Sequence, residues 1–341
     1  MKSIKKKYLY VWACDFSKSR GEGLLARNFI KDCSRFTNKK IYINGKSYSD
    51  LKKKNIQIKT NIFNNYFYPF LGVLKIWREH LSRQQTIYLN YLPLWNCLLF
   101  LFLPRKTILG PITGGSFYSD TKSFNYYIRK YLFPVLFFLI LKIIKKKFDK
   151  VIFSTDLLKK YKNKNKKFIF NYCLNIYDKK IYKNDKKYDV IFYYRINKNK
   201  NNLLQKKLIK KLIKNNYKII IIGDNPNLKN AIYLGNLDRE KVLFYISKSK
   251  LAVNNNENIY SLFCIDSLSC GTKVIFFGKK INQYNYFNTG SILCRKINNV
   301  DRQFLLLKKL LRAKNNKKIS VNKNFFKNKN KINKHFLNLH L

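Results

Sequence analysis

The chain has 341 residues, of which 71 are Lys or Arg and 17 are Asp or Glu, so its formal net charge at pH 7 is +54. Hydrophobic residues make up 46% of the sequence and aromatic residues 16%, which excludes a wholly disordered chain because compact cores need this apolar material. The length suits two domains of ordinary size.

The positive charge has two explanations that composition leaves open. It is typical of a protein that binds a polyanion, either nucleic acid or an anionic membrane surface. A genome rich in A and T would also produce it, because the codons for Lys, Asn and Ile are A/T-rich and the lysines are scattered along the chain. The charge therefore does not by itself identify a partner.

The seven cysteines are widely spaced and include no Cys-x-x-Cys pair, and the chain has three histidines. We therefore expect neither a disulfide scaffold nor a structural zinc site, and we expect a reducing, cytoplasmic compartment. The apolar stretch near the N-terminus ends at Asp15 without a small-residue cleavage site. It predicts a first strand and not a signal peptide.

The first half of the chain alternates short β-rich runs with helical patterns. A helix is predicted after Gly21-Glu22-Gly23, and another over residues 124–147. Strands are predicted at residues 8–13, 41–44, 86–91, 107–109, 151–154 and 167–170. Strands that alternate with helices indicate a parallel sheet with crossover connections.

The apolar run at 131–144 has three interpretations. It is shorter than the ~20 residues that a membrane-spanning helix needs, so a span is not expected. Three lysines follow it, at 145–147, which suits docking on an anionic bilayer surface. The favoured interpretation is a core helix that is buried on both sides.

The second half repeats the alternation after a polar, Lys-rich stretch at 175–188, which is the predicted linker. Helices are predicted over 239–247, with Asp238 as the N-cap, and over 261–269. Strands are predicted at residues 189–194, 218–222, 232–234, 250–254 and 272–277.

These patterns predict an α/β protein with two Rossmann-like, doubly wound domains. The first domain would cover residues 1–180 and the second residues 189–312. A basic tail over 313–341, with a weak helical pattern, would follow them.

Two candidate anion sites lie beyond the carboxyl ends of predicted strands, where open α/β sheets bind ligands. Gly21 and Gly23 open a helix, where glycines let backbone N–H groups approach an anion or simply form a tight turn. Arg195 and Lys200 follow the strand at 189–194. A guanidinium grips a phosphate bidentately, and a lysine adds a point charge beside it.

A third candidate is the segment 254–278, in which a strand ends in polar residues and a helix begins near Ser261. Glu257 lies in the predicted loop, in a position to bind sugar hydroxyls, and Asp266 lies on the helix, in a position to accept hydrogen bonds from a ribose. Between them, the helix N-terminus at Ser261 and Leu262 offers N–H groups to a phosphate or carboxylate. A capping acid and a solvated acid are the alternative reading of the pair.

These residues resemble the GT-B glycosyltransferases, specifically family 4 and its retaining relatives. Arg195 and Lys200 have the spacing of the family's Gly-Arg-Leu-x-x-x-Lys-Gly pattern, and the segment from Glu257 looks like its Glu-x7-Glu donor-binding segment. The two acids here are nine residues apart instead of eight, so strict register would put Asn258 in the first acid's place. Asp266 is also one methylene shorter than the usual Glu. The similarity spans about residues 8–312, and only 254–275 is specific.

The resemblance implies a retaining, metal-independent transfer of a sugar from a UDP- or GDP-linked donor, bound in a cleft between the domains and with no separate cofactor. The catalytic residues would be Arg195, Lys200 and Glu257; the donor-binding residues would be Asp266, Gly21, Gly23, Ser261 and Leu262. Arg195 and Lys200 would neutralise the leaving diphosphate. No Asp-x-Asp occurs in the chain, in agreement with metal independence.

The implied acceptor is a glycan of the cell surface, such as lipopolysaccharide, or a lipid-linked sugar. The basic surface and the apolar helix would then bring the protein to the inner face of the cell membrane as a peripheral protein. Two other classes stay open. One is an inactive protein with the transferase fold, because the acid spacing is shifted. The other is a nucleic-acid-binding protein, because of the charge, although no recognition motif is present.

Overall fold

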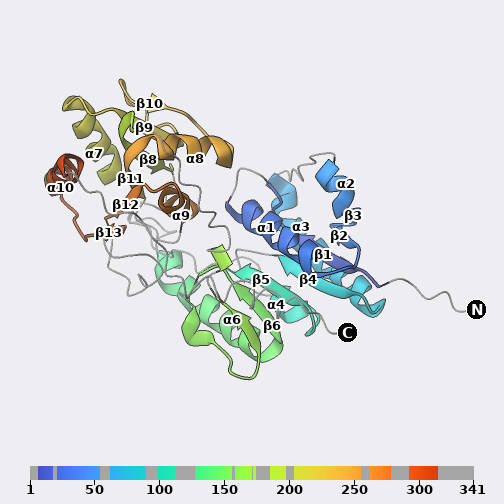
Figure 1. Cartoon of the computed structure of the whole chain (residues 1–341). Helices are drawn as coiled ribbons and strands as arrows, with labels where there is room; N and C mark the ends of the chain where they lie inside the picture. Colours follow the sequence, from blue (N-terminus) through green and yellow to red (C-terminus); the bar gives the residue numbers. More distant parts are fainter. Residues whose placement is uncertain are drawn as a thin grey trace, which may run out of the picture. The chain divides into compact units, whose positions relative to one another are not determined.

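The computed structural model describes residues 7–17, 21–53, 62–89, 99–112, 127–155, 158–170, 172–173, 185–196, 203–254, 261–277 and 292–313. These residues form two compact units, the first built on strands β1–β7 and the second on strands β8–β13 (Figure 1). Most of the predicted linker and nearly all of the predicted tail lie outside the described residues.

The first unit contains a seven-stranded sheet in the order β3-β2-β1-β4-β5-β6-β7. All its pairings are parallel except that of β2 with β3. Buried apolar residues fill the central strands, as is typical of a parallel sheet that is covered on both faces. The strands are β1 (Leu9–Ala13), β2 (Ile41–Ile43), β3 (Lys46–Ser47), β4 (Gln85–Leu89), β5 (Ile108–Ile112), β6 (Lys150–Phe153) and β7 (Lys167–Ile169).

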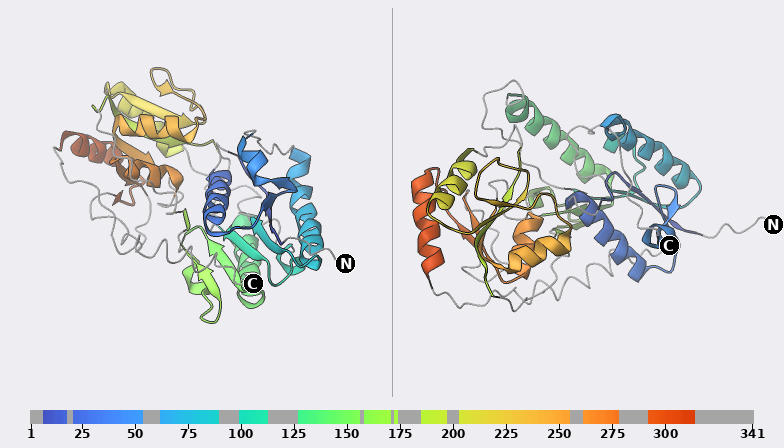
Figure 2. Two further views of the ribbon diagram at one scale, coloured as in Figure 1. Left: turned by 45° about the vertical axis from the view of Figure 1, so that its right-hand side comes forward. Right: turned by 90° about the horizontal axis from the view of Figure 1, so that it is seen from above.

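The helices of this unit cover both faces of the sheet. Helix α1 (Gly21–Phe36) connects β1 to β2, on one side of β1 in the strand order, whereas α3 and α6 belong to connections on the other side of β1. Because such crossovers are right-handed, α1 lies on one face of the sheet and α3 and α6 lie on the other. The right-hand view of Figure 2 shows α1 on one side and α3 and α6 on the other. The remaining helical segments of this unit are α2 (Tyr48–Lys53), α3 (Ile62–Leu81), α4 (Leu99–Phe102), α6 (Phe133–Lys147) and the 3-10 helix η2 (Lys159–Tyr161). The π-helix η1 (Ile128–Leu132) directly precedes α6, and its residues 128–130 belong to the second unit.

Helix α6 is buried on one side only. Val135, Phe138 and Leu139 on its other side are between 42% and 56% exposed. The prediction of a core helix buried on both sides is therefore wrong, because α6 lies in an outer layer, where the sheet covers only its inner side. The inner side is formed by Phe137, Ile140, Leu141 and Ile144. No helix in the described part of the chain is long and apolar enough to cross a membrane.

The second unit contains a six-stranded sheet, entirely parallel, in the order β10-β9-β8-β11-β12-β13. The strand order reverses between β8 and β11, which is the switch point of a doubly wound sheet. β9 consists of four buried isoleucines and a glycine, and it lies between β10 and β8. The strands are β8 (Tyr188–Tyr194), β9 (Ile219–Gly223), β10 (Ile232–Tyr233), β11 (Ser249–Asn254), β12 (Lys273–Phe276) and β13 (Ile292–Cys294).

Two pairs of helices cover this second sheet. Helices α7 (Leu203–Lys214) and α10 (Val300–Arg312) pack together over one apolar cluster, which includes Leu212 and Phe304. Helices α8 (Arg239–Ser247) and α9 (Leu262–Ser269) also contact each other. They belong to the connections that lead to β11 and β12, on the other side of β8 from β9, and right-handed crossovers therefore place them on the opposite face of the sheet. The predicted fold class, α/β with two doubly wound units, is confirmed.

The two predicted helix starts in the second unit have different outcomes. Ser261 is the N-cap of α9, and its Oγ accepts a hydrogen bond from the backbone N–H of Cys264 at 3.1 Å. Asp238 occupies the N-cap of α8, but its side chain makes no capping hydrogen bond. The predicted side-chain cap at Asp238 is therefore wrong; its backbone carbonyl accepts from Val242 instead.

Candidate functional site

Strands β8 and β11 bring predicted site residues to one edge of the second sheet. The two strands are parallel neighbours, with Phe192 opposite Val253, so they end side by side at Tyr194 and Asn254. Arg195 follows β8 and is exposed. Lys200 and Glu257 lie outside the described residues, and their predicted roles stay predictions.

The turn that carries Arg195 is held by Asp224, the residue after β9. Asp224 Oδ2 accepts a hydrogen bond from the backbone N–H of Ile196 at 2.6 Å, and the backbone N–H of Asp224 donates to the Tyr194 carbonyl at 2.9 Å. Gly223 has a φ of +103°, and a Cβ there would lie 2.2 Å from the Tyr194 carbonyl oxygen. Only glycine permits this approach, so Gly223 and Asp224 fix the direction in which the chain leaves β8.

The N-terminus of α9 is attached to the end of β11. The Ser261 hydroxyl donates to Oδ1 of the buried Asn254 at 2.8 Å. The backbone N–H of Leu262, in the first turn of α9, has no partner within its helix, as at any helix N-terminus. The structure thus places Ser261 and Leu262 beside the switch point, and their binding of an anion stays a prediction.

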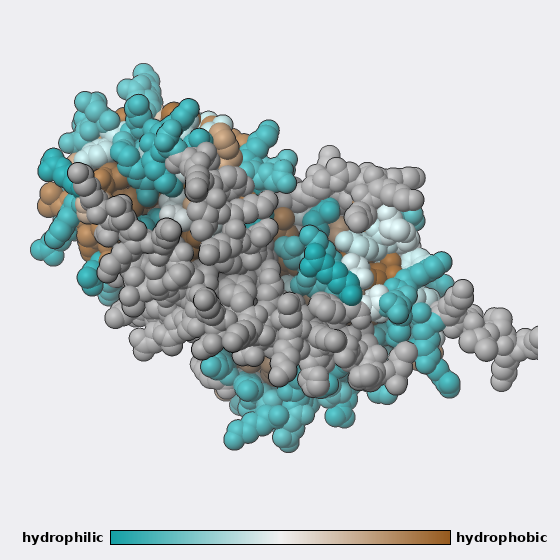
Figure 3. All heavy atoms as spheres, in the orientation of Figure 1, coloured by the Kyte–Doolittle hydropathy of each residue, from teal (hydrophilic) through white to brown (hydrophobic). Residues whose placement is uncertain are grey.

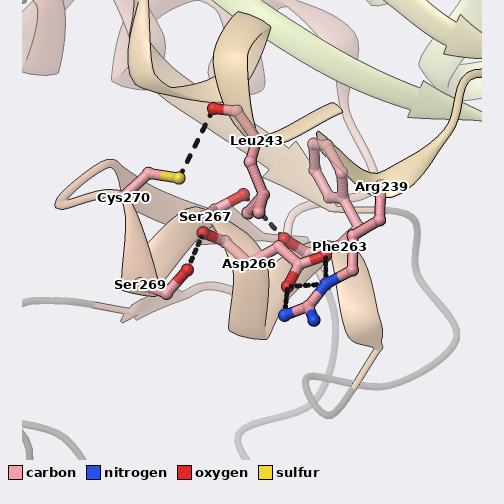
Figure 4. Close-up of polar contacts among 7 residues, drawn as sticks. All are labelled: Arg239, Leu243, Phe263, Asp266, Ser267, Ser269 and Cys270. Carbon is pink, nitrogen blue, oxygen red and sulfur yellow. Dashed lines mark hydrogen bonds and ion pairs between the residues drawn. The ribbon is translucent and has the colours of Figure 1, made fainter. Parts of the chain in front are cut away.

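Asp266 faces Arg239, the first residue of α8 (Figure 4). Arg239 Nε donates to both carboxylate oxygens of Asp266, at 3.1 and 3.3 Å, and Arg239 Nη2 donates to Oδ1 at 2.8 Å. The side chains are 5% and 23% exposed for Asp266 and Arg239. Burial raises the pKa of the Asp266 carboxyl, and the guanidinium of Arg239 acts against this by favouring the ionised form. The carboxylate that was predicted to bind ribose is therefore engaged by a cation, and its ribose contact stays a prediction.

Further contacts hold α8 and α9 together around this pair (Figure 4). Cys270 Sγ donates to the Leu243 carbonyl at 3.5 Å, and Ser269 Oγ donates to the Asp266 carbonyl at 2.8 Å. Burial raises the pKa of the Cys270 thiol to about 12, so it is not a nucleophile at neutral pH. Among the described residues, no three His, Cys, Asp or Glu side chains are grouped so that they would hold a metal ion.

Sequence reasoning did not single out Arg239, Asn254 or Asp224 as site residues. Arg239 lies 27 residues from Asp266, and nothing in the sequence links the two. The one available signal is that arginine is rare beside lysine in this chain, and that this arginine opens a helix. Asp224 follows a glycine at a strand end, which is a position that favours turn formation.

In the first unit, Gly21 and Gly23 lie in the first turn of α1, as predicted. A Cβ on Gly23 would lie 2.3 Å from the Ser17 carbonyl oxygen. Arg27 holds the same segment, since its Nε donates to the Phe16 carbonyl at 2.9 Å and its guanidinium lies over the Phe16 ring. Gly23 is thus needed for packing between this segment and α1. Its approach to a phosphate stays a prediction.

Several solved structures share the fold of this chain, and their names include a UDP-N-acetylglucosamine 2-epimerase and complexes with UDP-sugars. A UDP-N-acetylglucosamine 2-epimerase from Rickettsia bellii has a TM-score of 0.54 at 11% identity, over 91% of this chain and 89% of that chain. UGT2 from Phytolacca americana, complexed with UDP-2fluoro-glucose and pterostilbene, has a TM-score of 0.52 at 10% identity, over 90% and 91%. Alr3699/HepE from Anabaena, in complex with UDP-glucose, has a TM-score of 0.51 at 10% identity, over 97% and 93%.

No protein-family model matches the chain, and no curated protein matches its sequence. Identities of 10 to 11% show the fold and leave the reaction open. The two doubly wound sheets, parallel except for the pair β2 and β3, agree with this likeness. The chain adopts the GT-B fold.

Proposed function

We propose that this protein is a glycosyltransferase that takes a sugar from a UDP- or GDP-linked donor. The observation that supports it is that β8, which Arg195 follows, ends beside β11, whose last residue is hydrogen-bonded to the N-cap of α9. A guanidinium and a helix N-terminus both attract anions, and ligands of open α/β sheets bind at the switch point. A diphosphate suits this pair of groups.

In this proposal the second unit binds the donor. Arg195 and Lys200 neutralise the charge that develops on the leaving diphosphate, which is the task that a metal ion performs in other transferases. The N–H groups at Ser261 and Leu262 contact the phosphates, and Glu257 holds hydroxyls of the donor sugar. The absence of Asp-x-Asp from the sequence supports a metal-independent reaction. From the family resemblance we propose a retaining reaction, and no protein nucleophile is assigned.

For Asp266 we propose a ribose contact made jointly with Arg239. A carboxylate has about four acceptor positions, and the three hydrogen bonds from Arg239 leave one for a ribose hydroxyl. Arg239 would in turn keep Asp266 ionised, since its charge opposes the effect of burial on the pKa.

For the acceptor we propose a cell-surface glycan or a lipid-linked sugar, reached at the inner face of the cell membrane. The excess of lysine and arginine supports this location, because that membrane face is anionic.

Thermal unfolding in the presence of UDP, GDP, ADP or CMP tests the donor site. One nucleotide at about 100 times its dissociation constant is expected to stabilise the protein by about 2.7 kcal/mol. Arg195→Ala should abolish this stabilisation. Arg105→Ala removes an equal charge from an exposed arginine of the first unit and should leave it intact.

Three outcomes would contradict the proposal. If no nucleotide stabilises the protein while duplex DNA binds with a steep salt dependence, the positive charge of the protein functions in binding nucleic acid. If a nucleotide binds but no sugar reaches any glycan or lipid acceptor, the protein is an inactive member of the fold. If the nucleotide sugar is converted to an epimer without transfer, the reaction resembles that of the Rickettsia protein's class.

A further inference from the structure

The outer surface of the first unit is apolar along α3. Helix α3 buries Val73 and Ile76 on its inner side. Its outer side carries a second apolar stripe at helical spacing, Phe67, Leu71, Leu74 and Leu81, whose members are between 51% and 75% exposed. A helix that covers a sheet normally presents polar residues to solvent, so this stripe needs a partner.

Helix α6 repeats this arrangement. Val135, Phe138 and Leu139 are exposed at positions i, i+3 and i+4, opposite the side that packs on the sheet. The same stripe continues as Lys142 and Lys146, at i+7 and i+11, and both lysines are exposed. Lys142 Nζ lies 4.4 Å from the centre of the Phe138 ring, so cation and apolar surface are directly adjacent.

Helix α4 connects these two stripes into one surface. Trp77 Nε1 of α3 donates to the Phe102 carbonyl, and Lys147 Nζ of α6 donates to the Leu101 carbonyl. Leu101 and Phe102 are themselves exposed. We call the exposed apolar side chains of α3, α4 and α6 the outer apolar face.

The charge around this face is almost entirely positive. Helix α6 ends in Lys145, Lys146 and Lys147, and α3 carries the exposed Lys75 and Arg78. The sequences of the three helices contain one acid, Glu79, and its carboxylate accepts a hydrogen bond from the Tyr8 hydroxyl. An apolar surface bordered by lysines matches a bilayer with anionic headgroups. A second copy of the chain fits less well, because a two-fold contact would bring the same lysines together.

We propose that the outer apolar face docks on an anionic lipid bilayer. The apolar stripes of α3 and α6 would lie at the boundary between headgroups and acyl chains, and the lysines of α6 would lie among the anionic headgroups. The proposal rests on the first unit alone, so it stands whether or not the second unit binds a nucleotide sugar.

Flotation with vesicles tests the apolar part. The wild-type chain should bind vesicles of phosphatidylglycerol and phosphatidylcholine and bind pure phosphatidylcholine vesicles weakly. The double variant Leu74→Glu/Leu139→Glu should bind about tenfold more weakly or worse, because charged side chains cannot enter the boundary region. The matched control is Phe244→Glu/Leu305→Glu in the second unit, which replaces similarly exposed apolar residues and changes the net charge by the same amount. It should bind like wild type.

A lysine pair tests the electrostatic part. Lys142→Gln/Lys146→Gln should weaken binding to the anionic vesicles by roughly fivefold for each lysine, the equivalent of about 1 kcal/mol each. Lys210→Gln/Lys214→Gln on α7 removes two exposed lysines at the same spacing and should have little effect. All four variants change exposed side chains, so their melting temperatures should stay near that of wild type.

The proposal fails if the wild-type chain does not float with phosphatidylglycerol vesicles. It also fails if the Leu74→Glu/Leu139→Glu variant binds as well as wild type, or if both lysine pairs have equal effects, since net charge alone would then explain binding. If the wild-type chain is a dimer that this glutamate variant dissociates while vesicle binding is unchanged, the face belongs to a second copy of the chain.

Discussion

The helices of the two units present different side chains to solvent although the two sheets are wound in the same way. In the second unit, α7 buries Leu208 and Leu212 and directs lysines outward, which is the ordinary amphipathic pattern. In the first unit, α6 buries an equivalent inner stripe, but its outer side carries Phe138 and Leu139. Both helices are rich in lysine, so charge does not distinguish them. They differ in the exposed apolar residues that lie beside the lysines on α6.

This difference bears on the origin of the net charge. Lysines scattered over a polar helix are what an A/T-rich genome would produce, and they need no partner. Lysines that continue an exposed apolar stripe point more specifically to a partner. Exposing the apolar side chains to water is unfavourable in free energy, and a partner that covers them would remove this cost. The two units together therefore contain both kinds of positive surface.

The largest expected effect concerns the ion pairs of the two units. Arg239→Leu should lower the free energy of unfolding of the second unit by about 3–5 kcal/mol, because it leaves the buried carboxylate of Asp266 without a partner. Urea unfolding followed by circular dichroism measures this loss. Asp266→Asn should cost less, since the partly exposed guanidinium of Arg239 regains contact with water.

The comparison pair in the first unit is Arg105 with Asp149, in which Arg105 Nε lies 3.6 Å from Asp149 Oδ1. The side chains of Arg105 and Asp149 are 70% and 48% exposed. Arg105→Leu should cost at most about 1 kcal/mol, because solvent screens an exposed pair. Equal losses in Arg239→Leu and Arg105→Leu would contradict the burial of the Asp266 pair.

The next effect separates buried from exposed leucines. Leu212→Ala on α7 should lower the free energy of unfolding by about 2–5 kcal/mol, and Leu141→Ala on α6 should do the same, because both side chains are buried. Leu139→Ala, two residues from Leu141, should cost less than about 0.5 kcal/mol because its side chain is half exposed. Denaturant midpoints give all three values. A large loss in Leu139→Ala would mean that the outer side of α6 is covered in the free protein.

The smallest effect is a rate of thiol labelling, which compares how often each unit opens. Cys33 of the first unit and Cys270 of the second are buried. Burial raises the pKa of Cys270 to about 12 and that of Cys33 well above its ordinary range. Iodoacetamide reacts with thiolates, so both cysteines should be labelled very slowly at neutral pH, as peptide mapping by mass spectrometry would show. Rapid labelling of one of them would identify its unit as the less stable.

The sign of the pH dependence follows from the same shift. The folded state of Cys270 keeps its proton up to about pH 12, whereas an exposed thiol loses it near pH 9.0. Its contribution to stability is therefore complete below pH 9.0 and is lost as the pH rises from there to about 12. Stability that rises over this interval in wild type relative to Cys270→Ala would contradict the assignment.

Local pattern was enough to predict most of the fold. Strands such as β1, β9 and β12 are short, continuous apolar runs bounded by polar residues or glycine, and each was predicted within one or two residues. The strand β3 was missed because its two residues, Lys46 and Ser47, are polar and form no apolar run. The three-residue strand β13 was also missed. The outward stripe of α6 was missed because an apolar run gives no sign of whether one or both of its sides are covered.

The candidate site was predictable only in part. The helix start near Ser261 was predicted correctly, because helix starts carry local signals. The partner of Asp266 was not predictable, because Arg239 comes from another helix and the contact depends on how α8 packs on α9. The positions of Lys200 and Glu257 remain sequence predictions.

The composition of strand β9 bears on how this protein would aggregate when it unfolds. Four consecutive isoleucines and Gly223, flanked by Lys218 and Asp224, form a short segment with high β-propensity and no internal charge, which is the composition of segments that aggregate when exposed. In the folded second unit, β8 and the two-residue edge strand β10 cover it. If the two-residue strand β10 detaches, β9 becomes the edge strand of the sheet. Only the charges of Lys218 and Asp224 at its two ends would then oppose pairing with a strand of another chain.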